Sequence, residues 1–319
     1  MLKYILRRLA QAVPTLLGVT ILSYALMSSA PGGPVAALAY GPTVSNAQKA
    51  KLAEQLGVND PWIVQYVRWL GEIVHGDLGR SFAAKRPVLD LILERAPATL
   101  ELGGLALFFG ILFGVPLGVW AAVRRGSWFD NVTRVGAVIV TAVPTFWLGL
   151  ILILIFGSWL KLLPMGGRFP TTLSGDYTVG DRIRHLILPV FVLAMGNIAG
   201  LSRYMRAATL EVSRQDYIRT AQAKGLRMRS VWYVHAMRNA LIPLATFLGP
   251  AVVGLLNGAI ITETIFSWPG LGRLTIEAVG QFDYPVVMAT VLIGAVSTIL
   301  GYLLSDILYA TIDPRIRYS

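Results

Sequence analysis

Six long apolar windows constrain this chain more than any other feature of its sequence. They cover residues 9–30, 100–123, 135–160, 186–202, 240–261 and 286–310, and the fourth is the shortest and most polar at its edges. A helix that crosses the hydrocarbon core of a membrane needs about 20 predominantly apolar residues. Charged residues make up 14% of the chain, whereas soluble domains carry about 25%. The sequence therefore predicts an all-α integral membrane protein with about six transmembrane helices.

The first window could also be read as a signal peptide. Lys3, Arg7 and Arg8 precede it, and residues 28–30 (Ser-Ser-Ala) resemble a cleavage site. Its apolar stretch is longer than the roughly 7–15 residues of a signal core. We therefore expect this helix to be retained, with cleavage as the alternative.

The distribution of Lys and Arg predicts the orientation. With the N-terminus inside, the inner segments 1–8, 124–134, 203–239 and 311–319 hold 16 basic residues, and the short outer loops 161–185 and 262–285 hold 5. Cytoplasmic loops carry such an excess, so both termini are predicted to be cytoplasmic. The net charge of +11 then reflects topology and does not indicate nucleic-acid binding. The predicted organisation is a cytoplasmic N-terminus and first helix (1–30), an outer segment (31–99) and a five-helix core (100–319).

Glycines recur at four-residue spacing in two windows. Gly110, Gly114 and Gly118 do so in the second, and Gly254 and Gly258 do so in the fifth. This spacing favours close helix–helix packing in lipid. Pro116, among the first three, is predicted to kink its helix, and a gating hinge there is the alternative to simple packing.

The sequence lacks the usual elements of a membrane enzyme. It has no cysteine, its three histidines (His75, His185 and His235) fall in separate loops, and no Gly-Lys pair of a phosphate-binding P-loop occurs. A secondary transporter would place ionisable residues at mid-span, whereas Glu101, Glu263 and Asp306 lie near span ends, where we expect interfacial roles. Asn257 lies deeper, and it is predicted either to line a polar pathway or to make an interhelical hydrogen bond.

The inner segment 203–239 has an ordered pattern. Ser213 and Asp216 have the spacing of a capping box, residues 217–224 are predicted to form a short helix, and Gly225 supplies a left-handed stop. Tyr217, Ala221 and Gly225 would share one helix face, within a basic rim of Arg214, Arg219, Lys224, Arg227 and Arg229. This pattern fits either a docking surface for another protein or a helix lying on an anionic leaflet.

Residues 217–225 (YIRTAQAKG) and 235–243 (HAMRNALIP) resemble the cytoplasmic EAA loop of binding-protein-dependent ABC permeases. The usual Glu-Ala-Ala start is replaced by Arg219-Thr220-Ala221, as in the dipeptide/oligopeptide branch. Further strings resembling that branch occur in order along the chain, at 65–66, 76–79, 81, 87–88, 97–101, 263–272 and 313–315. The chain thus resembles the DppB/OppB-type permeases over almost its whole length.

The resemblance implies a type I (MetI-like) importer permease with a long outer segment after the first helix and no ATPase site or cofactor of its own. It implies these partners: a second homologous permease in a heterodimer, two cytoplasmic ATPases that bind ATP and Mg²⁺, an extracytoplasmic solute-binding protein, and membrane lipid. It places coupling to the ATPases at Tyr217, Arg219, Thr220, Ala221, Ala223, Lys224 and Gly225, and a family-like outer loop at Glu263, Phe266, Pro269, Gly270 and Gly272. The implied substrates are dipeptides or oligopeptides, with glutathione, nickel chelates or oligosaccharides as alternatives in the same family.

Overall fold

The computed structural model describes residues 2–29, 60–170, 177–232, 237–241, 244, 249, 251, 253–255 and 259–312. In these residues the chain is helical, and its only β-type pairing is an isolated bridge between Arg80 and Pro87. The helices are α1 (Leu2–Ser28), α4 (Trp62–Val74), α5 (Val88–Val123), α6 (Trp128–Ala142), α7 (Thr145–Leu152), the π-helix η1 (Ile153–Trp159), α8 (Val179–Val212), α9 (Asp216–Ala223), α10 (Met228–Ser230), α11 (Met237–Ala240), α13 (Ile260–Ile265), α14 (Leu271–Gly280) and α15 (Tyr284–Ile312).

In the part of the chain that the structure describes, four helices are long and apolar enough to cross a membrane: α1, α5, α8 and α15. α5, α8 and α15 contain the second, fourth and sixth predicted windows, and α1 covers the first window as far as Ser28. α8 extends well beyond both ends of the fourth window, which is the weakest. α5 has 36 residues and continues through Pro97 and Pro116. At 1.5 Å per residue it is roughly 54 Å long, which exceeds the hydrocarbon thickness of about 30 Å.

The third predicted window is not one continuous helix. It is divided between α6 and the α7–η1 pair, which are bent by 93°. The bend lies at Val143 and Pro144, where Val143 takes an extended conformation (φ −79°, ψ 123°). Proline lacks an amide hydrogen and disfavours helical geometry in the residue before it, so the break follows from the sequence. The fifth window, 240–261, lies largely outside the described residues.

α5 and α8 form the centre of the bundle, and glycines of α5 line their contact. A Cβ atom on Gly110 would lie 2.6 Å from the Cβ of Asn197, and one on Gly118 would lie 2.4 Å from the Ser202 carbonyl oxygen. The predicted close approach at Gly110, Gly114 and Gly118 is therefore confirmed. In the fifth window, Gly254 has no described atom within 4 Å of the position that a Cβ would take, so the close approach expected there is not seen among the described residues, and Gly258 lies outside them.

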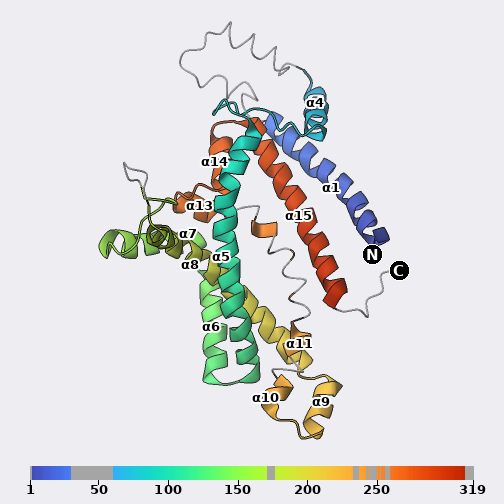
Figure 1. Ribbon diagram of the computed structural model, residues 1–319, viewed down its shortest axis with the longest axis vertical. Helices are drawn as coiled ribbons and strands as arrows, with labels where there is room; N and C mark the ends of the chain where they lie inside the picture. The colour runs from blue at the N-terminus through green and yellow to red at the C-terminus, as the bar shows by residue number, and fades with distance from the viewer. Residues whose placement is uncertain are drawn as a thin grey trace.

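The two ends of the bundle carry different features (Figure 1). At one end, here called the α14 end, lie α14, α4 and the starts of α5 and α15. At the opposite end, here called the α9 end, lie α9, α10 and the turn between α5 and α6. α1 packs beside α15, and α4 is tied to α1 by a 3.0 Å hydrogen bond between the Thr20 and Tyr66 hydroxyls.

Candidate functional site

The predicted short helix at the α9 end is present as α9. Its N-terminal cap is Gln215, without a side-chain hydrogen bond. Ser213 instead ends α8, and its hydroxyl donates to the Leu210 carbonyl at 2.6 Å. The predicted capping box is therefore wrong, because α8 continues long enough to take up Ser213. Only Gln215 and Arg214 separate this C-terminal residue of α8 from α9.

Gly225 ends α9 in the left-handed conformation that the sequence predicts. Its φ is +73°, its amide donates to the Gln222 carbonyl, and the Leu226 amide donates to the Ala221 carbonyl. This pair of bonds is the Schellman motif, which favours glycine because other residues strain in that conformation. No atom of the described residues lies within 4 Å of the position that a Cβ would take, so the requirement for glycine is conformational.

One side of α9 is buried within the chain itself. Ile218 and Ala221 form a small apolar cluster with Val231, and Ala221 is 7% exposed. The expectation that Ala221 lies on the exposed docking face is therefore wrong. Its side chain packs α9 against the rest of the chain, on the side opposite to the exposed face. The other six predicted coupling residues are exposed: Tyr217, Arg219, Thr220, Ala223, Lys224 and Gly225.

A basic rim surrounds this exposed face, hereafter the α9 surface. Arg214, Arg219, Lys224 and Arg227 are all exposed, and Arg219 makes a 3.4 Å exposed ion pair with Asp216. The side chain of Arg229 lies outside the described residues. The α9 surface is thus a short helical ridge with positive charge at its edges.

An ion pair that the sequence reasoning missed ties α8 to α6. Asp130, which is 1% exposed, accepts two hydrogen bonds from Arg206 at 2.5 and 2.8 Å, and a third from the Gly126 amide. Removing one partner of such a buried pair leaves an uncompensated charge. Ser127 caps the start of α6 by accepting from the Asp130 amide, but nothing in the sequence indicated Arg206 as the partner of the Asp130 carboxylate.

The predicted outer loop folds around the carboxylate of Glu263 at the α14 end. Glu263 is 0% exposed and accepts from the Thr99 hydroxyl at 2.8 Å and the Arg273 amide at 3.0 Å. Its expected interfacial, water-accessible role is therefore wrong. A Cβ atom on Gly270 would lie 2.4 Å from this carboxyl group, and one on Gly272 would lie 2.9 Å from it.

Aromatic residues fix the rest of that loop. Phe266 packs with Leu188 and Val192 of α8. The indole of Trp268, fully buried, donates to the Ala98 carbonyl at 2.8 Å, and Pro269 is half-buried. The predicted outer-loop residues therefore form one structural unit with α5 and α8, whereas Asn257 lies outside the described residues.

Two further carboxylates organise the same region. Glu101 binds Arg168 and Arg182, each at 2.7 Å, and its side chain is 15% exposed; its interfacial role stays a prediction. Asp283, which is 2% exposed, accepts from the Ser81 hydroxyl and from the Phe82 and Ala83 amides. The sequence strings included Ser81, but its partner 202 residues away carried no recognisable signal.

Two family models together match nearly the whole chain. Residues 114–318 match the model of the binding-protein-dependent transport system inner membrane component, and residues 1–103 match the N-terminal model of such membrane components. The chain is 44% identical to the oligopeptide transport system permease protein AppB of Bacillus subtilis (strain 168). It is 42% identical to the dipeptide transport system permease protein DppB of Escherichia coli (strain K12). Both alignments cover 100% of each chain.

A solved structure supports the same fold. A chain of the MetNI methionine ABC transporter, in an inward-facing conformation, matches with a TM-score of 0.53 at 20% identity, over 72% of this chain and 98% of that one. The arrangement is therefore that of a MetI-like, type I importer permease, and the apolar helices make it a multi-pass membrane protein. The chain belongs to the family of inner membrane components of binding-protein-dependent transport systems.

Proposed function

We propose that this chain is one permease subunit of an ATP-driven importer of dipeptides or oligopeptides. The relatives named for oligopeptide, dipeptide and di/tripeptide transport support this substrate class. Glutathione, nickel chelates and oligosaccharides are the alternatives. A partner solute-binding protein would carry most of the substrate selection and deliver the substrate to this subunit.

The observation that carries the proposal is the α9 surface. In the proposed complex it docks on one of two cytoplasmic ATPases, which bind ATP and Mg²⁺, while a second, homologous permease completes the pathway. The basic excess in segments 124–134 and 203–239 supports a cytoplasmic α9 end. Both termini are then cytoplasmic, in the inner membrane of a bacterium.

The packing suggests how motion at α9 would reach the bundle. α9 follows α8 almost directly, α8 packs along α5 through the glycines, and Arg206 ties α8 to α6. These elements would move as one unit. ATP binding that stabilises a closed ATPase pair would then favour one bundle conformation, as a ligand favours the state that it binds more tightly.

Copurification and reconstitution test this proposal. The chain, isolated from its native membrane, should be recovered with a homologous permease and two ATPases. In vesicles, this complex should take up a labelled dipeptide only with ATP on the cytoplasmic side of the membrane and the solute-binding protein on the other side. A homo-oligomer of this chain that transports the peptide without ATPases would contradict the proposal.

A further inference from the structure

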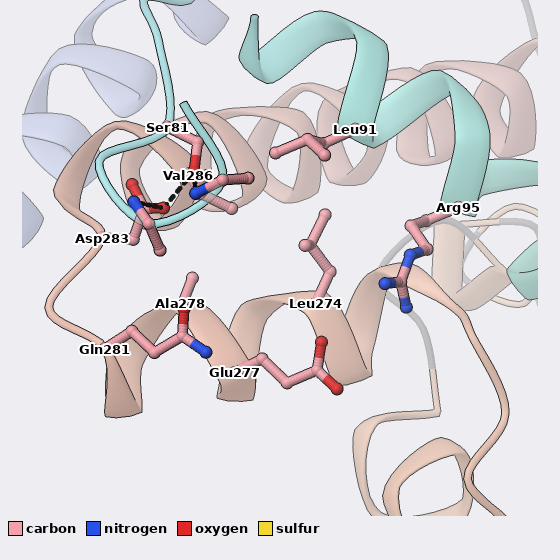
Figure 2. A pocket seen from close by; sticks show the side chains of 11 residues that line it. Ser81, Leu91, Arg95, Leu274, Glu277, Ala278, Gln281, Asp283 and Val286 are labelled. Carbon is pink, nitrogen blue, oxygen red and sulfur yellow. Dashed lines mark hydrogen bonds between the residues drawn. The ribbon is translucent and has the colours of Figure 1, made fainter. Parts of the chain in front are cut away.

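A pocket at the α14 end lies between the loop 81–84, the N-terminal turns of α5, and α14 (Figure 2). Its volume is about 250 Å³. Small-molecule sites in proteins usually measure about 300–1,000 Å³. The pocket therefore lies just below the usual size range of small-molecule sites.

The walls of the pocket are held in place by the fold. Asp283 binds the Ser81 hydroxyl at 2.5 Å and two amides of the same loop. Beneath the pocket, Leu91 of α5, Leu274 of α14 and Val286 of α15 belong to one buried apolar cluster. A site formed before binding costs less conformational entropy when a partner docks.

The pocket contains a guanidinium that has no partner among the residues that the structure describes. Arg95 extends from α5 toward the cavity (Figure 2), is half-buried, and makes no ion pair or hydrogen bond within the described residues. The acid of the lining on α14, Glu277, is already bonded to Arg273 at 2.7 Å. The exposed Gln281 adds a carboxamide on the α14 side.

These features favour an acidic side chain as the occupant. A partly desolvated cation is stabilised by a hydrogen-bonded carboxylate, and arginine can bind a carboxylate through two parallel bonds. Exposed Lys85 follows the lining residue Ala84 in the sequence and adds positive charge to that loop. Glu277 and Asp283 already have partners, so the guanidinium of Arg95 points to an aspartate or glutamate presented by another protein.

We propose that this pocket is a socket for an acidic side chain of the solute-binding protein, with Arg95 as its principal contact. The proposal rests on the proposed function, because the α14 end must face outward for such a protein to reach it. It adds to that function a specific docking contact and a charge requirement on the partner.

The first test measures docking of the solute-binding protein used in the reconstitution above to the complete complex in lipid nanodiscs. Arg95→Gln should raise the Kd by about ten- to hundredfold, the range expected for loss of a hydrogen bond to a charged group. Arg95→Glu should raise it further, and Arg95→Lys should retain part of the affinity. Docking of the unchanged complex should also weaken as salt is raised.

Arg86 offers a matched control, because it is an exposed arginine of the same end that is paired with Glu94 at 3.2 Å and does not line the pocket. Arg86→Gln should change the Kd by less than about threefold, because exposed ion pairs contribute little. Recovery of every variant with the ATPases shows that the chain has folded. Equal Kd values for Arg95→Glu and the unchanged complex would overturn the socket, whereas no docking to the unchanged complex would overturn the proposed function.

Crosslinking gives a second test, since the chain has no cysteine. A photoreactive maleimide on Gln281→Cys should crosslink the solute-binding protein, and one on Val74→Cys, which is exposed on α4 outside the pocket, should not. An acid-to-lysine change in the crosslinked segment should restore docking to Arg95→Glu. Protection of Gln281→Cys by a dipeptide alone would identify the pocket as a substrate site and overturn the proposal.

Discussion

At the scale of single residues, Gly225 should be the position of the α9 surface that tolerates substitution least. Gly225→Val should reduce peptide uptake and substrate-stimulated ATP hydrolysis, because a left-handed conformation costs a residue with a Cβ about 1–2 kcal/mol. Gly225→Asn should retain more activity, since asparagine tolerates this conformation. Both rates can be measured in vesicles containing the complete complex.

Arg125→Ala is the control for that experiment. Arg125 is exposed in the turn between α5 and α6, at the same end of the bundle but outside the α9 surface, and exposed ion contacts are worth at most about 1 kcal/mol. Its uptake should therefore remain close to that of the unchanged protein. Normal uptake by Gly225→Val at a normal protein level would show that the end of α9 does not matter for coupling.

The second prediction at this scale concerns the thermal stability of a variant at Gly270. Gly270→Ala would place a methyl group 2.4 Å from the buried Glu263 carboxyl group, and overpacking of this kind typically costs about 1–3 kcal/mol. The variant should have a lower melting temperature in detergent. Gly280→Ala, at the end of α14 with nothing within 4 Å among the described residues, should leave the melting temperature nearly unchanged. Equal melting temperatures for the two variants would contradict the packing described around Glu263.

At the scale of elements, the contact between α5 and α8 predicts unequal effects of glycine substitutions in one helix. Gly118→Ala would bring a methyl group 2.4 Å from the Ser202 carbonyl oxygen, whereas Gly104 has no described neighbour within 4 Å. Gly118→Ala should therefore lower the yield of folded protein and the melting temperature, and Gly104→Ala should change neither. If both variants behaved alike, the glycines would not mediate this contact.

Element positions followed from the sequence where the signal was local. Apolar length located α1, α5, α8 and α15, and the four-residue glycine spacing located the contact face of α5. Gly225 was predictable because a left-handed glycine after a short helix is a local pattern. The bend after α6 could also have been predicted from Pro144. The continuous apolar window from 135 to 160 led instead to the prediction of a single helix.

The remaining features depend on pairs of residues that are far apart in sequence. Ser81 with Asp283, Asp130 with Arg206, and Thr99 with Glu263 meet only after the helices have packed. The inward face of α9 has the same origin, since Ala221 is buried by Val231 from the following segment. A single sequence shows the members of such pairs but not their pairing.

At the scale of the whole molecule, the charge distribution and the two-ended architecture predict one topology. The α9 end should face the cytoplasm and the α14 end the opposite side, because short inner loops carry 16 basic residues against 5 in short outer loops. The absence of cysteine allows a direct measurement with single-cysteine variants. Ala84→Cys at the α14 end and Met228→Cys at the α9 end are exposed positions whose replacement removes no charge.

A membrane-impermeant maleimide added to intact spheroplasts should label Ala84→Cys and should not label Met228→Cys. After permeabilisation, both variants should be labelled, which shows that Met228→Cys is accessible in the folded protein. Labelling of Met228→Cys in intact spheroplasts would reverse the orientation. That result would place the α9 surface away from ATP and the pocket at Arg95 away from any solute-binding protein, so one experiment tests the geometric premise of both proposals.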